Sequence, residues 1–403
     1  METRATEQEC TTTAVHPLDI SIVLPCLNEE GTLSECVQRA RAAIARSGLL
    51  GEVVVADNGS TDSSAAVARR AGARVVPVDE RGYGAALRGG IEASLGKWII
   101  MGDADGSYDF GEIAPIIERL QEGFDLVMGC RLPSGGGRIE KGAMPWLNRF
   151  VGNPVLSGLA RLFFKCPIHD FHCGLRGFSK SAFERMQLTT TGMELATEMV
   201  VKSKLYGLSI CEVPISLHPD KRDRPPHLRR WRDGWRHLRF LLLYSPKWLF
   251  FYPGLLMAFL GLAGASALIC GPLRVGRAVL DVHSLAYALL CCQMGLQLVL
   301  FAIFTKTYAI QARLLPQDKA FEKWTSWLTV EWGILVGACV AAAGLLLAVS
   351  AFTIWKRFDF GPLNATHTLL RIVLPSATLF SSGVEIGFAS FVLGVFKLPR
   401  KAA

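Results

Sequence analysis

Charged residues are scarce in this sequence: only 19% of its 403 residues are Asp, Glu, Lys or Arg, and 50% are hydrophobic. This balance is too apolar for an ordinary soluble protein of this length. The scarcity is uneven. Up to about Pro246, short apolar runs alternate with charged segments, and beyond it long apolar stretches carry few charges. The sequence therefore predicts a soluble domain followed by a membrane domain.

The first seventeen residues lack the apolar run of a secretory signal peptide, so we expect the N-terminal domain not to be exported. The eleven cysteines would form disulfides only in an oxidising compartment, and we expect free thiols. Cys166, His169, His172 and Cys173 lie close together in the sequence but lack the spacing of a standard zinc site. A zinc site there is the less favoured alternative.

Four apolar stretches, each near or above the ~20 residues that cross hydrocarbon as a helix, predict four membrane spans. They are residues 248–270, 285–304, 332–354 and 369–396. Basic residues concentrate between the second and third stretches and in the tail: Lys306, Arg313, Lys319, Lys323, Lys397, Arg400 and Lys401. Since cytoplasmic loops are rich in Lys and Arg, we expect both termini and the soluble domain in the cytoplasm of a multi-pass protein, in a bacterial plasma membrane.

Glu385 stands near the middle of the fourth stretch. A carboxylate at that depth is costly, which indicates either a functional role or an interhelical hydrogen bond. Both alternatives stay open.

The net charge of +8 does not indicate nucleic acid, because many basic residues lie just before the first span, in HLRRWRDGWRHLRF. At helical spacing, Leu228, Trp231, Trp235, Leu238 and Leu242 share one side of this segment. This pattern predicts an amphipathic helix on the membrane surface, in contact with lipid. A solvated basic linker is the alternative.

Short β-branched runs alternate with helical stretches in the first part of the chain. The expected strands are 19–27, 52–56, 74–78, 98–101 and 125–128, and the expected helices are 32–46, 63–71, 85–94 and 113–122. This alternation predicts an α/β domain with a mainly parallel sheet and helices on both faces. Such sheets bind ligands at the carboxyl ends of their strands.

Polar and acidic residues follow three of these strands. They are Asn28, Glu29 and Glu30 after the first, Asp57, Asn58 and Asp62 after the second, and Asp103 and Asp105 after the fourth. Clustered carboxylates repel one another unless a cation lies among them, so the pattern predicts a divalent metal. Turn formation by Asp and Gly is the alternative for Asp103 and Asp105.

The ordered motifs PCLNEE, VVADNGSTD, RGYGAALRGG and GDADGSYDF resemble the nucleotide-binding half of family 2 glycosyltransferases with the GT-A fold. GCRLPSGG, HDFHCGLRGF and GMELATEM, followed by EVPI, narrow the resemblance to polyprenyl-phosphate sugar transferases of the dolichyl-phosphate mannose synthase type. The resemblance covers roughly residues 19–240. It implies a nucleotide-sugar donor and a polyprenyl phosphate acceptor, of the undecaprenyl or dolichyl type.

On the donor side, the resemblance implies that Pro25, Asn28 and Glu29 line the nucleotide pocket. Asp57 would accept hydrogen bonds from the base, whereas Asp62 would cap a helix.

For the metal, the resemblance implies that Asp103 and Asp105 hold Mg2+ or Mn2+ against the diphosphate. Ser107 stands where the mannose synthase has Gln, so this third metal contact departs from the family pattern. A hard cation with oxygen ligands would stabilise the charge that develops on the leaving diphosphate.

The acceptor determines which side chains the reaction needs. A lipid phosphate is already largely ionised near neutral pH, with a second pKa of about 6, so it needs cations to position it rather than a strong base. Guanidinium groups suit phosphate geometry. The resemblance implies acceptor-side roles for Arg131 and Arg149, with Asn153 in place of the family's Ser, and Arg176 is a third candidate arginine.

Glu194 and Glu198 lie one helical turn apart and face the same way. They would orient the sugar or cap a helix, and Glu198 is the favoured site residue. Together with Asp105, Arg131 and Arg149 it forms the predicted catalytic set.

The expected architecture is a polar tail at 1–18, a GT-A domain at 19–226, a juxtamembrane amphipathic segment at 227–246, a four-helix membrane domain at 247–397 and a cytoplasmic tail at 398–403. The expected function is inverting transfer of a hexose from a GDP- or UDP-sugar to polyprenyl phosphate. The sequence leaves open which sugar is transferred and whether copies of the chain form a homo-oligomer.

Two alternatives remain. A processive polysaccharide synthase carries QxxRW on its interfacial helix, whereas residues 227–231 are His-Leu-Arg-Arg-Trp and lack the Gln amide. A catalytically inactive transferase-like membrane scaffold would have lost the metal aspartates, which this chain retains.

Overall fold

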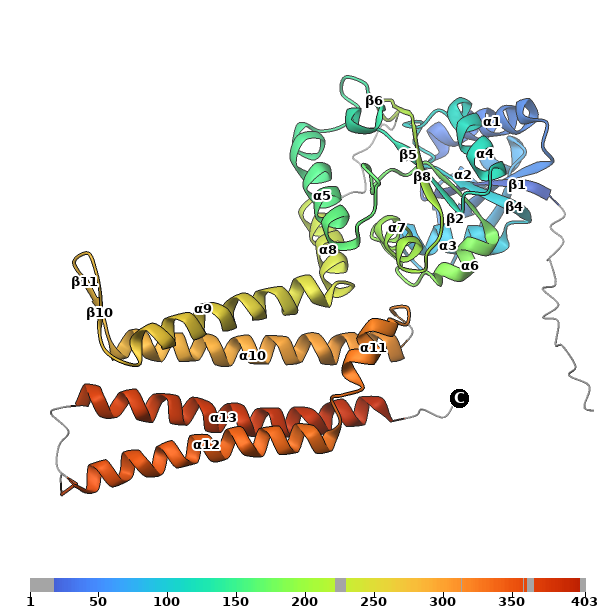
Figure 1. Cartoon of the computed structure of the whole chain (residues 1–403). Coiled ribbons are helices and arrows are strands. Elements are labelled where there is room, and N and C mark those ends of the chain that lie inside the picture. Colours follow the sequence, from blue (N-terminus) through green and yellow to red (C-terminus); the bar gives the residue numbers. More distant parts are fainter. Residues whose placement is uncertain (1–17, 222–229, 313, 358, 361–365, 399–403) are drawn as a thin grey trace, which may run out of the picture. The chain divides into compact units, whose positions relative to one another are not determined.

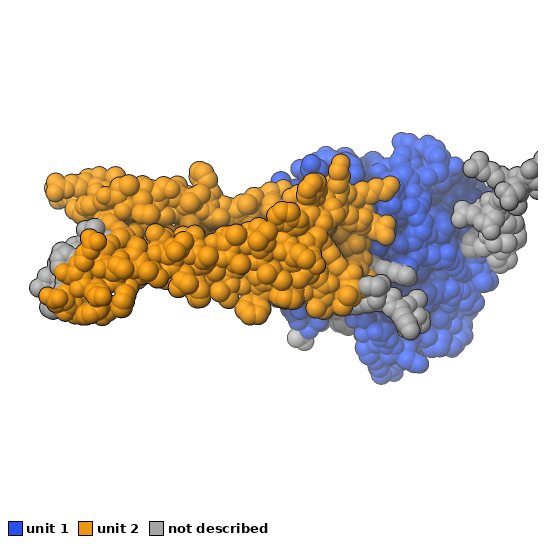
Figure 2. Space-filling view, turned by 60° about the horizontal axis from the view of Figure 1, so that its bottom comes forward, with its two compact units in different colours: residues 1–241 blue, residues 242–403 orange. Residues whose placement is uncertain are grey.

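The computed structural model describes residues 18–221, 230–312, 314–357, 359–360 and 366–398. The chain divides into two compact units, residues 1–241 and 242–403, which Figure 2 colours separately. The predicted N-terminal tail up to residue 17 lies outside the described residues, as do residues 227–229 of the His-Leu-Arg-Arg-Trp string, and with them Leu228. So do Arg313, Arg400 and Lys401.

The described part of the first unit is built on a seven-stranded sheet with the order β3-β2-β1-β4-β7-β5-β8. The strands are β1 Leu18–Cys26, β2 Gly51–Asp57, β3 Arg74–Pro77, β4 Gly96–Met101, β5 Leu126–Cys130, β7 Arg176–Ser179 and β8 Ile210–Pro214. Neighbouring strands are parallel except at β7, which runs antiparallel to both β4 and β5. The predicted mainly parallel sheet is confirmed.

Helices lie on both faces of this sheet (Figure 1). They are α1 Glu30–Ser47, α2 Ser64–Arg70, α3 Tyr83–Ala93, α4 Ala114–Gln121, α6 Lys180–Met186 and α7 Leu195–Leu205. Outside these layers lie α5 Asn153–Phe164, α8 Arg230–Leu243, the short helical turns η1 Phe110–Ile113, η2 Pro133–Gly135 and η3 Asn148–Gly152, and the paired strands β6 Arg138–Ile139 and β9 Ser216–Leu217.

Burial explains why the first strand and helix form where they do. In β1, Ile20, Ile22, Val23 and Leu24 have no exposed surface, because a central strand of a parallel sheet is covered on both faces. In α1 the buried residues recur every three or four positions, and the helix ends at Gly48, whose φ of 70° is left-handed.

The strand register brings several loops to one edge of the sheet. Cys26 pairs with Asp57 at the ends of β1 and β2, and Val23 pairs with Met101 at the end of β4. Since β7 is antiparallel, its first residue, Arg176, lies opposite Met101. The loops after β1, β2, β4 and β5 therefore meet the segment before β7.

The described part of the second unit contains four helices long and apolar enough to cross a membrane: Lys247–Leu268, Val282–Gln311, Val330–Lys356 and Leu369–Lys397. The first comprises η4 Lys247–Phe251 and α9 Tyr252–Leu268, the next two are α10 and α12, and the last lies in α13 Thr366–Lys397. Between them lie the hairpin of β10 Leu273–Val275 with β11 Ala278–Leu280, and α11 Lys319–Thr325.

Glycines let the helices of this unit approach closely. A Cβ on Gly295 of α10 would lie 2.5 Å from the backbone nitrogen of Ala258 and 2.7 Å from the carbonyl oxygen of Gly254, both on α9. Likewise, a Cβ on Gly344 of α12 would lie 2.5 Å from the backbone nitrogen of Phe380 on α13. Small residues of this kind are typical of helix contacts in membranes.

Side-chain hydrogen bonds join α10 to α13. Gln293 of α10 donates to Glu385 of α13 at 2.5 Å and accepts from Ser382 at 2.7 Å. Glu385 thus has an interhelical partner, which favours the hydrogen-bond alternative for this mid-span carboxylate.

Replacing Gly295 with Ala should lower the thermal unfolding midpoint of the detergent-purified protein, since overpacking costs roughly 1–3 kcal/mol. Gly387 of α13 is the matched control, because a Cβ there would meet no atom within 4 Å. Gly387→Ala should leave the midpoint unchanged or slightly raised. Equal losses in the two variants would contradict close packing of α9 on α10.

Candidate active site

The loops after β1 and β2 form one hydrogen-bonded structure. Asn28, with a φ of 58°, accepts from the backbone N–H of Thr61 at 2.7 Å, and its own N–H donates to Ser60 at 3.0 Å. Asp57 accepts from the N–H of Ser60 at 3.2 Å. The backbone N–H of Glu29 donates to the Ser64 hydroxyl at 2.8 Å. These contacts gather the predicted nucleotide-side residues after Pro25, the penultimate residue of β1.

The loop after β4 carries the predicted metal aspartates. Asp103 accepts from the Tyr83 hydroxyl at 2.8 Å, and burial raises the pKa of that tyrosine well above its usual value, so its hydroxyl remains a donor. Asp105 is almost fully buried and accepts from the N–H and the hydroxyl of Ser107, at 2.9 and 2.6 Å. Ser107 therefore orients Asp105.

The carboxylates of Asp103 and Asp105 are the oxygen ligands that Mg2+ and Mn2+ prefer. Within the described residues, no three His, Cys, Asp or Glu side chains gather in a way that could hold an ion. Two carboxylates suit a cation that completes its coordination with water and substrate phosphates, as Mg2+ usually does. The donor set therefore fits the predicted metal.

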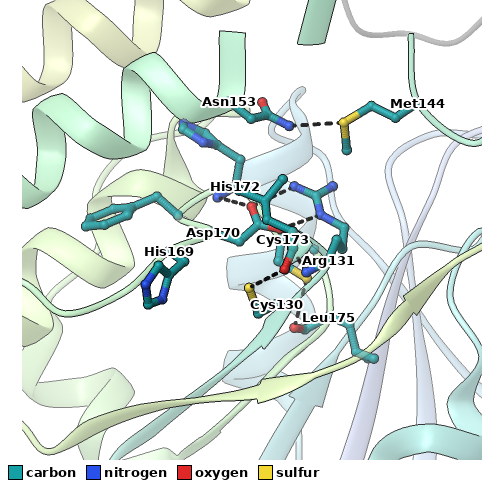
Figure 3. Close-up of polar contacts among 12 residues, drawn as sticks. Cys130, Arg131, Met144, Asn153, His169, Asp170, His172, Cys173 and Leu175 are labelled. Atoms are coloured by element: carbon teal, nitrogen blue, oxygen red, sulfur yellow. Dashed lines mark hydrogen bonds and ion pairs between the residues drawn. The ribbon is translucent and has the colours of Figure 1, made fainter. Parts of the chain in front are cut away.

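Arg131 follows β5 directly and forms a bidentate ion pair with Asp170, shown in Figure 3. Its Nε lies 2.7 Å from Oδ2 and its Nη2 lies 2.9 Å from Oδ1. Asp170 is fully buried and Arg131 nearly so. Burial raises the pKa of Asp170, but the charge and hydrogen bonds of Arg131 outweigh burial and hold this pKa below its usual value. Both groups are therefore charged near neutral pH.

Tyr108 and Gly174 connect the acidic loop with Arg131. The Tyr108 hydroxyl accepts from Arg131 at 3.3 Å and from the N–H of Gly174 at 2.8 Å. A Cβ on Gly174 would lie 2.7 Å from Asp103 and 3.1 Å from the Tyr108 hydroxyl. The loop that carries Asp103 thus lies close to Arg131, with Gly174 and the Tyr108 hydroxyl between them.

The other acceptor-side candidates have different surroundings. Arg176 has no exposed surface and donates to the carbonyl oxygens of Cys173 and Ala196, so its guanidinium supports the backbone. Arg149, in η3, is partly exposed and lies over the ring of Phe150. Asn153 begins α5 and donates to the sulfur of Met144 at 3.5 Å. The acceptor roles of these three residues stay predictions.

Glu194 and Glu198 differ sharply despite their similar positions in the sequence. Glu198 is fully buried, pairs with Lys202 at 2.8 Å and accepts hydrogen bonds from the N–H and hydroxyl groups of Thr189 and Thr190. In contrast, Oε2 of Glu194 is buried and has no hydrogen-bond partner among the described residues. Glu198 thus fixes a loop, while Glu194 retains an unused acceptor.

The four residues of the zinc alternative do not converge in the structure. The His169 ring contacts Glu212 at 2.8 Å, whereas the His172 ring packs against His237. Cys166 and Cys173 are buried free thiols, and burial raises their pKa values to about 11 and about 12.

Exposed apolar side chains gather on two helical segments of the first unit. On η3 and α5 they are Phe150, Val151, Val155 and Leu162, with Trp146 just before η3, and on α8 they are Trp231 and Trp235. The α8 residues agree with the amphipathic pattern in the sequence. The apolar face of η3 and α5 was not predicted, although Trp146 and Phe150, like Val151 and Val155, lie one helical turn apart.

Replacing Asp170 with Asn should lower the free energy of unfolding at pH 7 by about 3–5 kcal/mol, because Arg131 would remain buried without its counter-charge. Since the pKa of Asp170 is lower in the folded state, the pair stabilises the protein above pH ~4 and loses this effect as the pH falls through the folded pKa. Unfolding of wild type and variant in denaturant, compared across pH, measures the difference.

The exposed ion pair of Arg119 with Glu122 is the control for this measurement. Glu122→Gln should change the free energy of unfolding by about 0–1 kcal/mol. If Asp170→Asn is equally mild, the buried pair is not the anchor of this loop.

Two families of sequences match this chain. Residues 21–187 match Glycosyl transferase family 2, and residues 303–397 match the Glycosyltransferase family 2 C-terminal transmembrane region. The low-salt glycan biosynthesis hexosyltransferase Agl6 of Haloferax volcanii is 36% identical over 381 residues, which are 93% of this chain and 88% of that protein.

Two further proteins each match about half of this chain. A dolichyl-phosphate hexose transferase of Haloferax volcanii is 30% identical over 203 residues, 49% of this chain and 82% of that protein. A crystal structure of glucosyl-3-phosphoglycerate synthase from Mycobacterium tuberculosis, in complex with Mn2+ and UDP-glucose, matches with a TM-score of 0.44 and 25% identity. That match covers 57% of this chain and 79% of the synthase.

The match to Agl6 extends over both units, and the two family matches fall one in each. The chain belongs to glycosyltransferase family 2, as an integral membrane glycosyltransferase that carries the family's C-terminal transmembrane region.

Proposed function

We propose that this enzyme transfers a hexose from a GDP- or UDP-sugar to a polyprenyl phosphate, with inversion at the anomeric carbon. The observation that carries the proposal is the contact across Gly174, which brings the Asp103 carboxylate beside the hydroxyl that Arg131 contacts. The anionic donor would then meet the cation at the aspartates, and the anionic acceptor would meet Arg131, at the same edge of the sheet. The name of the dolichyl-phosphate hexose transferase adds support for the acceptor.

On the donor side, Asp103 and Asp105 would hold Mg2+ or Mn2+ against the diphosphate, and the cation would stabilise the charge on the departing nucleotide. Ser107 orients Asp105 through its hydroxyl, so we assign Ser107 a supporting role. The joined loops of Asn28 and Asp57 would receive the nucleotide, next to Pro25 and Glu29.

On the acceptor side, Arg131 would attract and orient the lipid phosphate. Asp170 holds two guanidinium nitrogens, Nε and Nη2, and Nη1 lies near the Tyr108 hydroxyl. Arg149, with Asn153 four residues later, would supply a second cation, while Arg176 would act through the backbone that it supports.

The reaction then needs no strong base. A phosphate oxygen forms the new bond to the anomeric carbon, opposite the breaking bond to the diphosphate, which leaves with the electron pair. This in-line displacement inverts the anomeric carbon. Because the phosphate is already largely ionised at neutral pH, little proton transfer accompanies the step.

Glu194 is the better candidate for contact with the sugar. Its Oε2, which has no hydrogen-bond partner in the part of the chain that the structure describes, would accept a hydrogen bond from a sugar hydroxyl, whereas both carboxylate oxygens of Glu198 are used within the fold. We therefore propose a substrate-orienting role for Glu194 and a positioning role for Glu198, in place of the catalytic role that the sequence favoured for Glu198.

The exposed faces of α5 and α8 would contact the membrane that supplies the acceptor. Trp231 and Trp235 of α8 alternate with arginines, a combination that suits an interface with anionic headgroups. The distribution of basic loop residues supports a cytoplasmic position for this domain. A bacterial plasma membrane stays a prediction, since the relatives include proteins of the archaeon Haloferax volcanii.

Asp105→Asn should abolish formation of lipid-linked sugar, lowering kcat by about 100-fold or more, because the cation and the diphosphate lose a shared ligand. The measurement is transfer of radiolabelled sugar from a panel of nucleotide-sugars to a short-chain polyprenyl phosphate, with Mg2+ or Mn2+. Asp109→Asn, four residues further on, is the control, because Asn keeps the oxygen that caps η1. A wild type that labels no lipid with any donor would overturn the proposed function.

Glu194→Gln should affect activity and Glu198→Gln should affect stability. The first should lower kcat about tenfold or more without changing the thermal midpoint, because one substrate hydrogen bond is altered. The second should lower the midpoint, because breaking a buried ion pair costs about 3–5 kcal/mol and Lys202 loses its partner. Activity assays beside thermal unfolding separate the two, and a folded but inactive Glu198→Gln would restore the catalytic assignment.

A further inference from the structure

Helix α8 has an exposed apolar face and a buried polar face. Trp231 and Trp235 are exposed, whereas Asp233 and His237 are buried. Buried polar groups such as the ring nitrogens of histidine usually have a hydrogen-bond partner. In α8 this partner is the Thr197 hydroxyl of α7, which lies 2.8 Å from Nδ1 of His237.

The ring of His237 also contacts the loop that precedes β7. Its centroid lies 4.6 Å from that of the His172 ring, and the two planes meet at 86°, an edge-to-face arrangement. Such contacts between aromatic rings stabilise a fold beyond the area that they bury. His172 and His237 thus link a helix with exposed tryptophans to the loop that carries Asp170.

His172 makes this contact at a cost. Both of its ring nitrogens are buried and lack a hydrogen-bond partner among the described residues. A buried polar group without a partner destabilises the folded state. Burial lowers the pKa of both rings, that of His237 to about 4, so neither carries a charge near pH 7. The ring of His172 therefore contributes by packing against His237 and not by charge or hydrogen bonding.

The backbone of His172 continues the connection toward Arg131. Its N–H donates to Oδ1 of Asp170 at 3.3 Å, and the same oxygen accepts from Nη2 of Arg131 at 2.9 Å. Figure 3 shows the His172 ring directed away from Arg131 while its backbone faces Asp170. A displacement of His172 would therefore disturb a hydrogen bond of the carboxylate that holds the Arg131 guanidinium.

We propose that the packing contact between His172 and His237, called the joint below, is how α8 holds Arg131 in place for the lipid phosphate. Both histidines are then positioning residues, and acceptor binding depends on how α8 packs against α7 and the loop before β7. The inference rests on the proposed role of Arg131 in acceptor binding. It extends that role by tying the acceptor site to a helix that carries membrane-facing tryptophans.

The test compares KM for a short-chain polyprenyl phosphate with KM for the nucleotide-sugar. His172→Ala and His237→Ala should each raise the acceptor KM about tenfold and leave the donor KM unchanged, because only the guanidinium is misplaced. The double variant should resemble the single ones, since either change breaks the same contact. His172→Phe keeps an edge-on ring without nitrogens and should retain the wild-type acceptor KM.

Glu118→Gln, on the exposed side of α4, is the control and should change neither KM. Additive effects of the two Ala variants, or equal rises in both KM values, would overturn the joint. His172→Phe as damaging as His172→Ala would also overturn it, because the ring nitrogens would then be the groups that matter.

Hydrogen exchange of the full-length protein gives a readout that does not depend on activity. His237→Ala should speed amide exchange in residues 168–174 as well as in α8, whereas Glu118→Gln should not. Unchanged exchange in 168–174 would refute the coupling. Failure of the wild type to label any lipid would instead refute the proposed function, with the exchange result still deciding the joint.

Discussion

A fully buried carboxylate, Asp170, fixes the geometry around Arg131, the residue to which we assign the acceptor phosphate. Such a group is stable only with a matched cation and hydrogen-bond donors, and Arg131 supplies a bidentate pair while the N–H groups of Arg131 and His172 complete the site. The N–H of Asp170 in turn donates to Glu212 of β8. The loop before β7 is thereby tied to Arg131 after β5 and to Glu212 of β8, while Gly174 lies against Asp103. These contacts join the proposed donor and acceptor sides.

The membrane unit relies on a different physical principle. Water is absent from hydrocarbon, so helices associate through close packing and through polar contacts rather than through the hydrophobic effect. Gly254 and Gly295 allow α9 and α10 to touch, and Gly344 does the same for α12 with α13. Between α10 and α13, Gln293 and Glu385 provide a hydrogen bond instead. Two glycine-packed hairpins are therefore joined by a polar contact.

The sequence predicted the parts of the fold that depend on local pattern. Continuous apolar runs marked β1, β2 and β4, and length with composition marked the four membrane-length helices. It did not predict β7, a four-residue strand containing Gly177 that is defined by its antiparallel neighbours. Arg131 was identified by resemblance, but its partner Asp170 was not, because the two are 39 residues apart and only the fold joins them. Spacing alone could not separate Glu194 from Glu198, although Lys202, four residues after Glu198, was a signal for its ion pair.

We propose that the acceptor is a phosphate held by arginine and not a hydroxyl activated by a base. The most direct measurement offers the purified full-length protein, in the same assay, a short-chain polyprenyl phosphate and the polyprenol of identical chain length. We expect that the phosphate becomes glycosylated and extractable into organic solvent, whereas the alcohol does not react. Glycosylation of the alcohol at a comparable rate, or retention of the sugar in a long polymer, would contradict it.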